Sequence, residues 1–278
     1  MRVPPWLHTG WSTHRGRRPI NEDAVIVDGS LLAVADGVGG APRGDLASVE
    51  AIDTVRSAIE AHEQPSEEPG NPAAAGELVG AIERADDAVK DLSRRWSELR
   101  GTATTMCAAL VYLDAQNRPH ALVANVGDSR CYLVRDGETR QVTVDQTLAV
   151  RLAQAGVDDI AERASHIVVS ILGGSLDSRP EIDLYGLALR PGDSLVLCTD
   201  GVSDVVEPGV MASLCGAFRR RPDMTAAALV RSAWDSRSGD NLTAAVAHID
   251  ERLDPAGETP GPGGRSAPST ADDPRGDR

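Results

Sequence analysis

The chain has 278 residues, enough for one large domain or two small ones, and 41% of them are hydrophobic. Only 3% are aromatic, so a core has to be built from Ala, Val, Leu and Ile. The formal net charge of -14 argues against nucleic acid or an anionic membrane surface as partner, because both repel an acidic protein.

Cysteine usage and the N-terminal stretch predict a cytoplasmic protein. The four cysteines form no CxxC pair, and most lie in apolar strand-like runs: Cys107, Cys131, Cys198 and Cys215. Buried thiols are therefore expected rather than zinc ligands or disulfides. The N-terminus lacks the apolar segment of a signal peptide, and no run approaches the roughly 18 apolar residues of a membrane span.

Strand-like apolar runs dominate the chain, and several are joined by tight glycine turns. They lie at residues 23–37, 102–114, 120–144, 194–201 and 241–250. The first run predicts a hairpin through Asp28-Gly29. Two long helices are predicted at residues 44–62 and 78–99. Shorter helices are predicted near residues 148–154, 210–218 and 225–234.

Each long helix carries an apolar stripe that is expected to pack on the core rather than to bind a partner. The first stripe consists of Leu46, Val49, Ile52, Val55 and Ile59. The second consists of Leu78, Ile82, Ala85, Val89, Leu92, Trp96 and Leu99. A polar loop at residues 63–76 separates the two helices, which predicts an antiparallel pair lying on a sheet.

The order of elements predicts an α+β fold. Strands in hairpins with helices in pairs favour antiparallel layers, and the absence of βαβ alternation disfavours a doubly wound parallel sheet. From about Asp250 the composition changes to Pro, Gly and charged residues with almost no apolar side chains. We therefore expect one folded domain over residues 1–250 and a disordered tail over residues 251–278.

Acidic residues follow or interrupt several of these strands. A single Asp-Gly is usually only a turn, but here the carboxylates recur at strand ends: Glu22, Asp23, Asp36, Asp128, Asp200, Asp204 and Asp240. If these ends converge, like charges raise one another's pKa, and a divalent cation resolves the conflict. An all-oxygen ligand set favours Mg²⁺ or Mn²⁺ over zinc, and a carboxylate that bridges two ions is the basis of a binuclear site.

Seven short motifs occur in a recognisable order. They are Arg18 with NEDA, then VADGVGG, GTATT, ANVGDSR, TVDQT, LVLCTDGVSD and SGDNLTAAV. With these motifs the chain resembles the metal-dependent serine/threonine protein phosphatases of the protein phosphatase 2C (PPM) family, and its bacterial members in particular. The match spans roughly Thr9 to Ile249. It implies a four-layer αββα sandwich, with two antiparallel β-sheets flanked by antiparallel helix pairs.

The resemblance also implies the ligands of two core Mn²⁺ or Mg²⁺ ions. Asp36 would bridge both ions. Asp200 and Asp240 would complete the shell of one. Glu22 and the carbonyl of Gly37 would serve the other, since glycine lets its backbone approach an ion closely.

Further roles follow from the same resemblance. Asp23 would hold metal-bound water, and Asp128 and Asp204, with Asp200, match the positions of a third, weaker metal. Arg18 matches the arginine that clamps the substrate phosphate, which suits the bidentate geometry of a guanidinium. A hydroxide that bridges the two ions would attack phosphorus in line. Arg18 and Asp36 are thus the side chains expected to be essential for catalysis.

The sequence departs from the family at two places. Many relatives carry a histidine, proposed as general acid, where this chain has Val38 or Ala41. The family's TxDH motif here ends in Gln146. No metal ligand is lost, so we expect an active enzyme with weaker catalysis on phosphoserine than on aryl phosphates. The proton could come from metal-bound water or another side chain, and His14 is not named as the acid. The flap, residues 149–179, shapes substrate choice in the family but identifies no substrate here.

Several alternatives remain open from the sequence. Arg15 or Arg17 could replace Arg18, Asp204 could merely cap a helix that begins near Val205, and Gly127–Ser129 could be only a hairpin turn. A catalytically weak phosphatase-like module that binds a phosphoprotein partner is the rival function. For the enzyme, the expected partners are phosphoprotein substrates, opposing a Ser/Thr kinase, and the expected state is a monomer that binds neither nucleic acid nor membrane.

Overall fold

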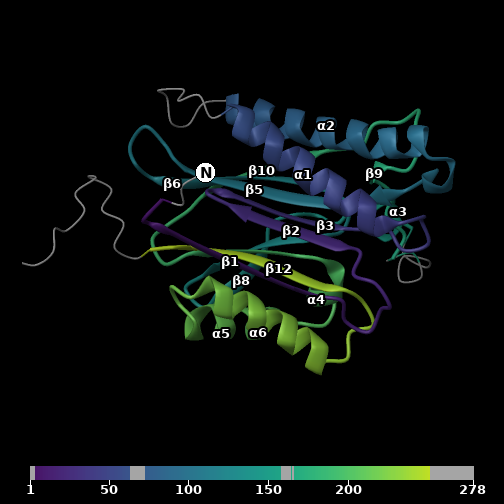
Figure 1. The fold of residues 1–278 in the computed structure, drawn as a ribbon. Helices are drawn as coiled ribbons and strands as arrows, with labels where there is room; N and C mark the ends of the chain where they lie inside the picture. Colours follow the sequence, from purple (N-terminus) through teal and green to yellow (C-terminus); the bar gives the residue numbers. More distant parts are fainter. Residues whose placement is uncertain (1–3, 63–72, 158–163, 165, 251–278) are drawn as a thin grey trace, which may run out of the picture.

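Two five-stranded antiparallel sheets lie face to face in the computed structural model, which describes residues 4–62, 73–157, 164 and 166–250 (Figure 1). The strands of the first sheet, in spatial order, are β1 (Leu7–His14), β12 (Leu242–Ile249), β11 (Ser194–Cys198), β7 (Arg130–Arg135) and β8 (Glu138–Gln141). Those of the second are β10 (Asp183–Ala188), β6 (Pro119–Val126), β5 (Met106–Leu113), β3 (Leu31–Asp36) and β2 (Asp23–Asp28). A further two-stranded sheet pairs β4 (Ala103–Thr104) with β9 (Leu172–Gly173).

A pair of helices covers the outer face of each sheet (Figure 1). The second sheet is covered by α1 (Gly44–His62) and α2 (Ala73–Arg95). The first is covered by α5 (Pro208–Ala217) and α6 (Pro222–Asp235). Three short helices complete the described elements: η1 (Ser97–Leu99), α3 (Leu148–Gln154) and α4 (Asp200–Ser203). The predicted four-layer αββα sandwich is therefore confirmed.

Three apolar layers hold the sandwich together, and the alternation along β3 shows how one strand serves two of them. Leu31 and Ala33 face the α1–α2 pair, whereas Leu32 and Val34 face the other sheet. A third layer lies between the first sheet and α5–α6. Strands buried on both faces have no polar side to display, which is why the sequence shows continuous apolar runs instead of strict alternation.

Most of the predicted elements are present in the structure. The first hairpin joins β2 to β3, with Asp28 opposite Leu31, so that the two turn residues are Gly29 and Ser30. Gly29 has φ = 59°, a conformation that glycine adopts without steric cost. Strands β1 and β10 were not predicted. Both are edge strands with many partly exposed side chains, so their apolar pattern is weak.

The predicted helix stripes are wrong at three positions. Leu46 and Val49 are 36% and 50% exposed, because α1 turns its small side chains, Ala47 and Ala51 among them, toward the sheet. Alanine allows a closer approach of helix to sheet than a larger side chain would. Trp96 is 55% exposed and lies just beyond the last residue of α2. The remaining positions of both stripes are buried or partly buried.

The four cysteines are free and buried, as expected. Within the described ranges, no helix is both long enough and apolar enough to cross a membrane. The predicted tail, residues 251–278, and most of the predicted loop at residues 63–76 lie outside the described residues. The proposed domain boundary at residue 250 therefore stays a prediction.

Candidate metal and phosphate site

An acidic cleft opens beside α4, whose first residue, Asp200, lines it. It is a cavity of about 280 Å³ lined by Arg18, Glu22, Asp36, Gly37, Val38, Gly39, Thr105, Asp128, His166, Val168, Asp200 and Asp240. Segments from both sheets and from the flap thus converge here. Apart from Asp23, which lies in β2 opposite Asp36, every residue expected to serve the two core metals lines this cavity.

The end of β3 delivers Asp36 to the cleft. Its side chain continues the alternation of Leu32 and Val34, so it leaves the strand on the side of the other sheet. Its backbone is fixed from two sides. The Asp36 N–H donates to Thr105 Oγ1 (3.0 Å), and its carbonyl accepts from Thr104 Oγ1 (2.8 Å) and the Thr105 N–H (2.9 Å). The threonines of the GTATT motif therefore position this carboxylate.

Gly37 is required by packing as well as by any role at a metal. A Cβ at this position would lie 2.5 Å from the carbonyl carbon and oxygen of Gly44, at the start of α1. Backbone atoms cannot move aside cheaply, so only glycine lets β3 end against this helix. The Gly37 N–H donates to the Glu22 carbonyl (3.1 Å), which joins the two segments that carry candidate ligands.

Asn241, to which no role was assigned from the sequence, holds the loop before β2 in place. Its side-chain amide donates to the carbonyls of Arg15 (2.8 Å) and Ile20 (2.9 Å), and its Oδ1 accepts from the Glu22 N–H (2.8 Å). The side chain is 3% exposed. The loop that carries Arg18 and Glu22 is therefore tied to the start of β12 by one buried amide.

Four carboxylates in or beside the cleft have raised pKa values. Burial, together with the neighbouring Asp200 and Asp240, raises the pKa of Asp23 to about 7. Burial raises the pKa of Asp128 to about 7 as well, and the Asp200 charge adds to the effect. The pKa of Asp36 lies well above its usual range, and that of Asp200 is also raised, in both cases chiefly by burial. Like charges held in one buried place disfavour ionisation unless a cation joins them.

The donor set fits a divalent cation that prefers oxygen. The Oδ1 atoms of Asp23 and Asp200 are buried without a hydrogen-bond partner among the described residues, which leaves them available. No cysteine lines the cleft, so Mg²⁺ or Mn²⁺ suits it better than zinc. In the described parts of the chain, however, no three His, Cys, Asp or Glu side chains already stand close enough together to hold an ion.

The Arg18 guanidinium is paired with Asp240. Its Nη2 lies 2.6 Å from Asp240 Oδ2, and its Nε donates to the Gly239 carbonyl (3.2 Å). Of the three candidate arginines, Arg18 alone lines the cleft within the described residues. Arg15 donates to the Arg18 carbonyl, and the guanidinium of Arg17 stacks over Trp234.

The residues expected to hold a third metal line a neighbouring cavity of about 270 Å³, which shares Asp128, His166 and Asp200 with the acidic cleft. Arg130 already neutralises part of the negative charge of this cavity, since its Nη2 lies 2.7 Å from Asp145 Oδ2 and 3.2 Å from Asp204 Oδ1. The alternative role of Asp204 as an N-terminal helix cap is wrong. Asp204 is the C-terminal cap of α4, and α5 begins only at Pro208.

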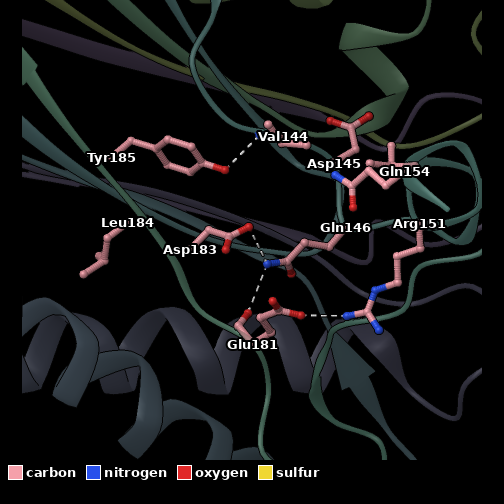
Figure 2. A pocket seen from close by; sticks show the side chains of 10 residues that line it. Val144, Asp145, Gln146, Arg151, Gln154, Glu181, Asp183, Leu184 and Tyr185 are labelled. Atoms are coloured by element: carbon pink, nitrogen blue, oxygen red, sulfur yellow. Dashed lines mark hydrogen bonds and ion pairs between the residues drawn. The ribbon is translucent and has the colours of Figure 1, made fainter.

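Gln146, which stands where relatives carry the histidine of the TxDH motif, has a structural role. Its Nε2 donates to the Glu181 carbonyl (3.1 Å) and to Asp183 Oδ2 (2.9 Å), as Figure 2 shows. Its Oε1 accepts from the Gly127 N–H (2.8 Å). The amide therefore joins the turn before Asp128 to the segment that leads into β10. It does not line the acidic cleft.

His166 is the candidate residue that sequence reasoning missed. It lines both the acidic cleft and the neighbouring cavity, although the flap sequence around it matches no motif. Its only signal was that it is the one histidine of the flap. His14, by contrast, accepts a hydrogen bond from the Gly16 N–H and packs edge-on against Trp234.

Known proteins of the same kind confirm the resemblance. A model of the protein phosphatase 2C family matches residues 12–232. Over 235 residues the chain is 33% identical to the serine/threonine protein phosphatase PstP of Mycobacterium tuberculosis. The matched region covers 84% of this chain but only 43% of that protein. This chain therefore spans less than half the length of that relative.

Solved structures agree with this assignment. The phosphatase Stp1 of Staphylococcus aureus superposes with a TM-score of 0.76 at 27% identity, covering 90% of this chain and 98% of that one. The catalytic domain of a serine/threonine phosphatase PstP in complex with two manganese ions gives a TM-score of 0.72 at 28% identity, covering 88% and 98%. The chain belongs to the protein phosphatase 2C family.

Proposed function

We propose that this chain is a protein-serine/threonine phosphatase that hydrolyses phosphoserine and phosphothreonine on proteins with two Mn²⁺ or Mg²⁺ ions. The set of buried carboxylates at the acidic cleft carries this proposal. The unpartnered Oδ1 atoms of Asp23 and Asp200 are its clearest sign, because a buried carboxylate oxygen without a partner is costly. A related catalytic domain that contains two manganese ions supports the same metal count.

The candidate ligands divide into two groups around Asp36. Asp200 and Asp240 would hold one ion, Glu22 with the Gly37 carbonyl would hold the other, and Asp36 would serve both. When bound, the ions supply a water of lowered pKa and neutralise the phosphoryl oxygens. The rest of the site is built by the chain: the Thr104–Thr105 backbone and hydroxyls fix Asp36 before any ion arrives.

Arg18 would bind and orient the phosphate. Its guanidinium now pairs with Asp240. A cation bound to Asp240 would neutralise the charge that attracts Arg18 and so weaken this ion pair. The guanidinium could then present two N–H groups to the phosphoryl oxygens. Arg18 would thus hold the phosphorus in line with the attacking water.

Asp128 and Asp204 would hold a third, weaker ion. The raised pKa of Asp128 supports this role, because burial disfavours the ionised carboxylate and a bound cation would stabilise it. Arg130 competes for the same place, since it lies 3.2 Å from Asp204 Oδ1. We therefore infer that this ion binds less tightly than the core pair.

A catalytically weak module that binds phosphoproteins is the second candidate function. The observation in its favour is that Val38 occupies the cleft where many relatives have a histidine. The preserved carboxylates argue against it, because a binding module has no need of a buried acidic set.

The partners of the enzyme would be phosphoproteins whose phosphorylation a Ser/Thr kinase installs. The net charge of -14 supports a protein that avoids nucleic acid and anionic membrane surfaces. We further propose a cytoplasmic location and a monomeric state.

Turnover of p-nitrophenyl phosphate and of a phosphothreonine peptide tests this function. We expect both substrates to be hydrolysed with Mn²⁺, and hydrolysis to stop with EDTA or in Asp36→Asn and Asp200→Asn. The control is Asp53→Asn, whose side chain lies 59% exposed on α1 and should leave turnover unchanged. Turnover that survives chelation would refute the metal mechanism. Binding of a phosphopeptide without turnover by the Mn²⁺-loaded wild type would favour the binding module.

A further inference from the structure

We propose that His166 is the general acid that protonates the leaving serine or threonine oxygen, in place of the histidine that this chain lacks at Val38 and Ala41. The inference rests on the proposed function. His166 lines the acidic cleft together with Arg18 and Asp36, so its side chain borders the space in which a phosphate would sit.

The other side chains around the cleft are poor proton donors for this step. The guanidinium of Arg18 does not release its proton in proteins. The carboxylates are the candidate metal ligands, and Val38 carries no proton to give. The Thr105 hydroxyl is occupied between the Asp36 N–H (3.0 Å) and Ser129 Oγ (2.8 Å). An imidazole, by contrast, gains and loses a proton near neutral pH in its unperturbed state.

The backbone around His166 is anchored, although the side chain is exposed. The Ile167 carbonyl accepts from the Leu148 N–H (2.8 Å), and the Val169 N–H donates to the Gln146 carbonyl (2.8 Å). Thr147 and Val168 pair between these two bonds as a single β-bridge. His166 is therefore held beside the cleft by a short paired segment.

Within the part of the chain that the structure describes, no hydrogen bond or ion pair engages either ring nitrogen of His166. Its charged neighbours in the two cavities come from several elements: Arg18, Glu22, Asp36, Asp128, Arg130, Asp145, Asp200, Asp204 and Asp240. Most of these neighbours are acidic.

The proton balance of the step is simple. A water oxygen forms a bond to phosphorus while the bond from phosphorus to the seryl oxygen breaks, and the electron pair of that bond stays on the seryl oxygen. The imidazolium of His166 gives its proton to this oxygen, which leaves as a hydroxyl. The water oxygen now bonded to phosphorus releases a proton to solvent, and the neutral ring takes up a proton from solvent, which its exposure allows.

This role removes the reason to expect weak activity on phosphoserine. A seryl alkoxide is a poor leaving group and needs a proton, whereas p-nitrophenolate is stable enough to leave without one. General acid catalysis of this kind contributes on the order of 10² to 10⁴ in rate. The decrease in rate when His166 is replaced should therefore depend strongly on the leaving group.

Kinetics of His166→Asn on the two substrates tests the proposal. We expect the ratio of kcat on a phosphothreonine peptide to kcat on p-nitrophenyl phosphate to fall by about 10²-fold. The matched control is His120→Gln, a histidine at the far end of β6 whose ring pairs with Asp114, and it should leave the ratio unchanged. Equal losses on both substrates, or no loss on either, would overturn the role of His166. Wild-type protein that hydrolyses neither substrate would instead refute the proposed function.

A second test reads the position of the ring without turnover. Mn²⁺ is paramagnetic and broadens the NMR signals of nearby protons, whereas Mg²⁺ is not. The chain has six histidines, and His166→Asn identifies the signals of His166 by their loss. With Mn²⁺ we expect these signals to broaden beyond detection while those of His120 stay sharp, and with Mg²⁺ both sets should remain. His166 signals that stay sharp in saturating Mn²⁺ would place the ring too far from the site and overturn the proposal.

Discussion

Without divalent cations, the free energy of unfolding should fall as the pH rises. The contribution of Asp23 to this fall can be calculated. Burial raises its pKa from the usual 3.8 to about 7 in the folded protein. Between these values the folded state binds a proton that the unfolded state has already released. Stability is therefore highest below about pH 4 for this group and is lost progressively up to about pH 7.

The size of the effect follows from the two pKa values. At about 1.36 kcal/mol per pKa unit, the difference between 3.8 and about 7 amounts to about 4 kcal/mol. Asp36, Asp128 and Asp200, whose pKa values are also raised, act in the same direction. A bound cation favours the ionised carboxylates and should abolish this decrease of the free energy of unfolding with rising pH.

The assay is urea unfolding of the wild type and of Asp23→Asn in EDTA, at several pH values. An amide cannot ionise, so the free energy of unfolding of the variant should rise relative to that of the wild type by about 2.3 kcal/mol between about pH 5 and pH 7. The exposed Asp53→Asn serves as control and should show no such gain. A difference between Asp23→Asn and wild type that stays constant over this range would refute the reasoning, because Asp23 would then be ionised throughout.

Three further substitutions probe the construction of the site. Asn241→Ala removes three hydrogen bonds and should lower the free energy of unfolding by about 2–4 kcal/mol in urea titrations, with weaker Mn²⁺ binding by calorimetry. Gly37→Ala places a methyl group 2.5 Å from the Gly44 backbone and should destabilise by about 1–3 kcal/mol, whereas Gly39→Ala, with 3.9 Å to the nearest atom, should unfold like the wild type. Arg18→Lys keeps the charge but loses bidentate binding, so KM for a phosphopeptide should rise by about tenfold; an unchanged KM would contradict the phosphate role of Arg18.

Much of the fold was predictable because local patterns report it. Tight glycine turns and long apolar runs give the strands, and 3.6-residue spacing gives α1 and α2. The two edge strands β1 and β10 escaped prediction, because a strand that is half exposed has no clear apolar pattern. The exposure of Leu46 and Val49 was also not predictable, since alanines decide how closely α1 approaches the sheet.

The sequence by itself determined that carboxylates lie at or just beyond the ends of buried strands, because Asp36 ends one apolar run and Asp200 follows another after Thr199. The contacts that bring the site residues together and hold them in place were decided only by the tertiary structure. Asn241 bonds to groups more than 200 positions away in the chain, and no local pattern records such a contact. His166 belongs to no motif and reaches the cleft only because the flap pairs with Thr147. Local sequence fixes the direction of a strand's last side chain, whereas a shared cavity exists only once distant segments have packed together.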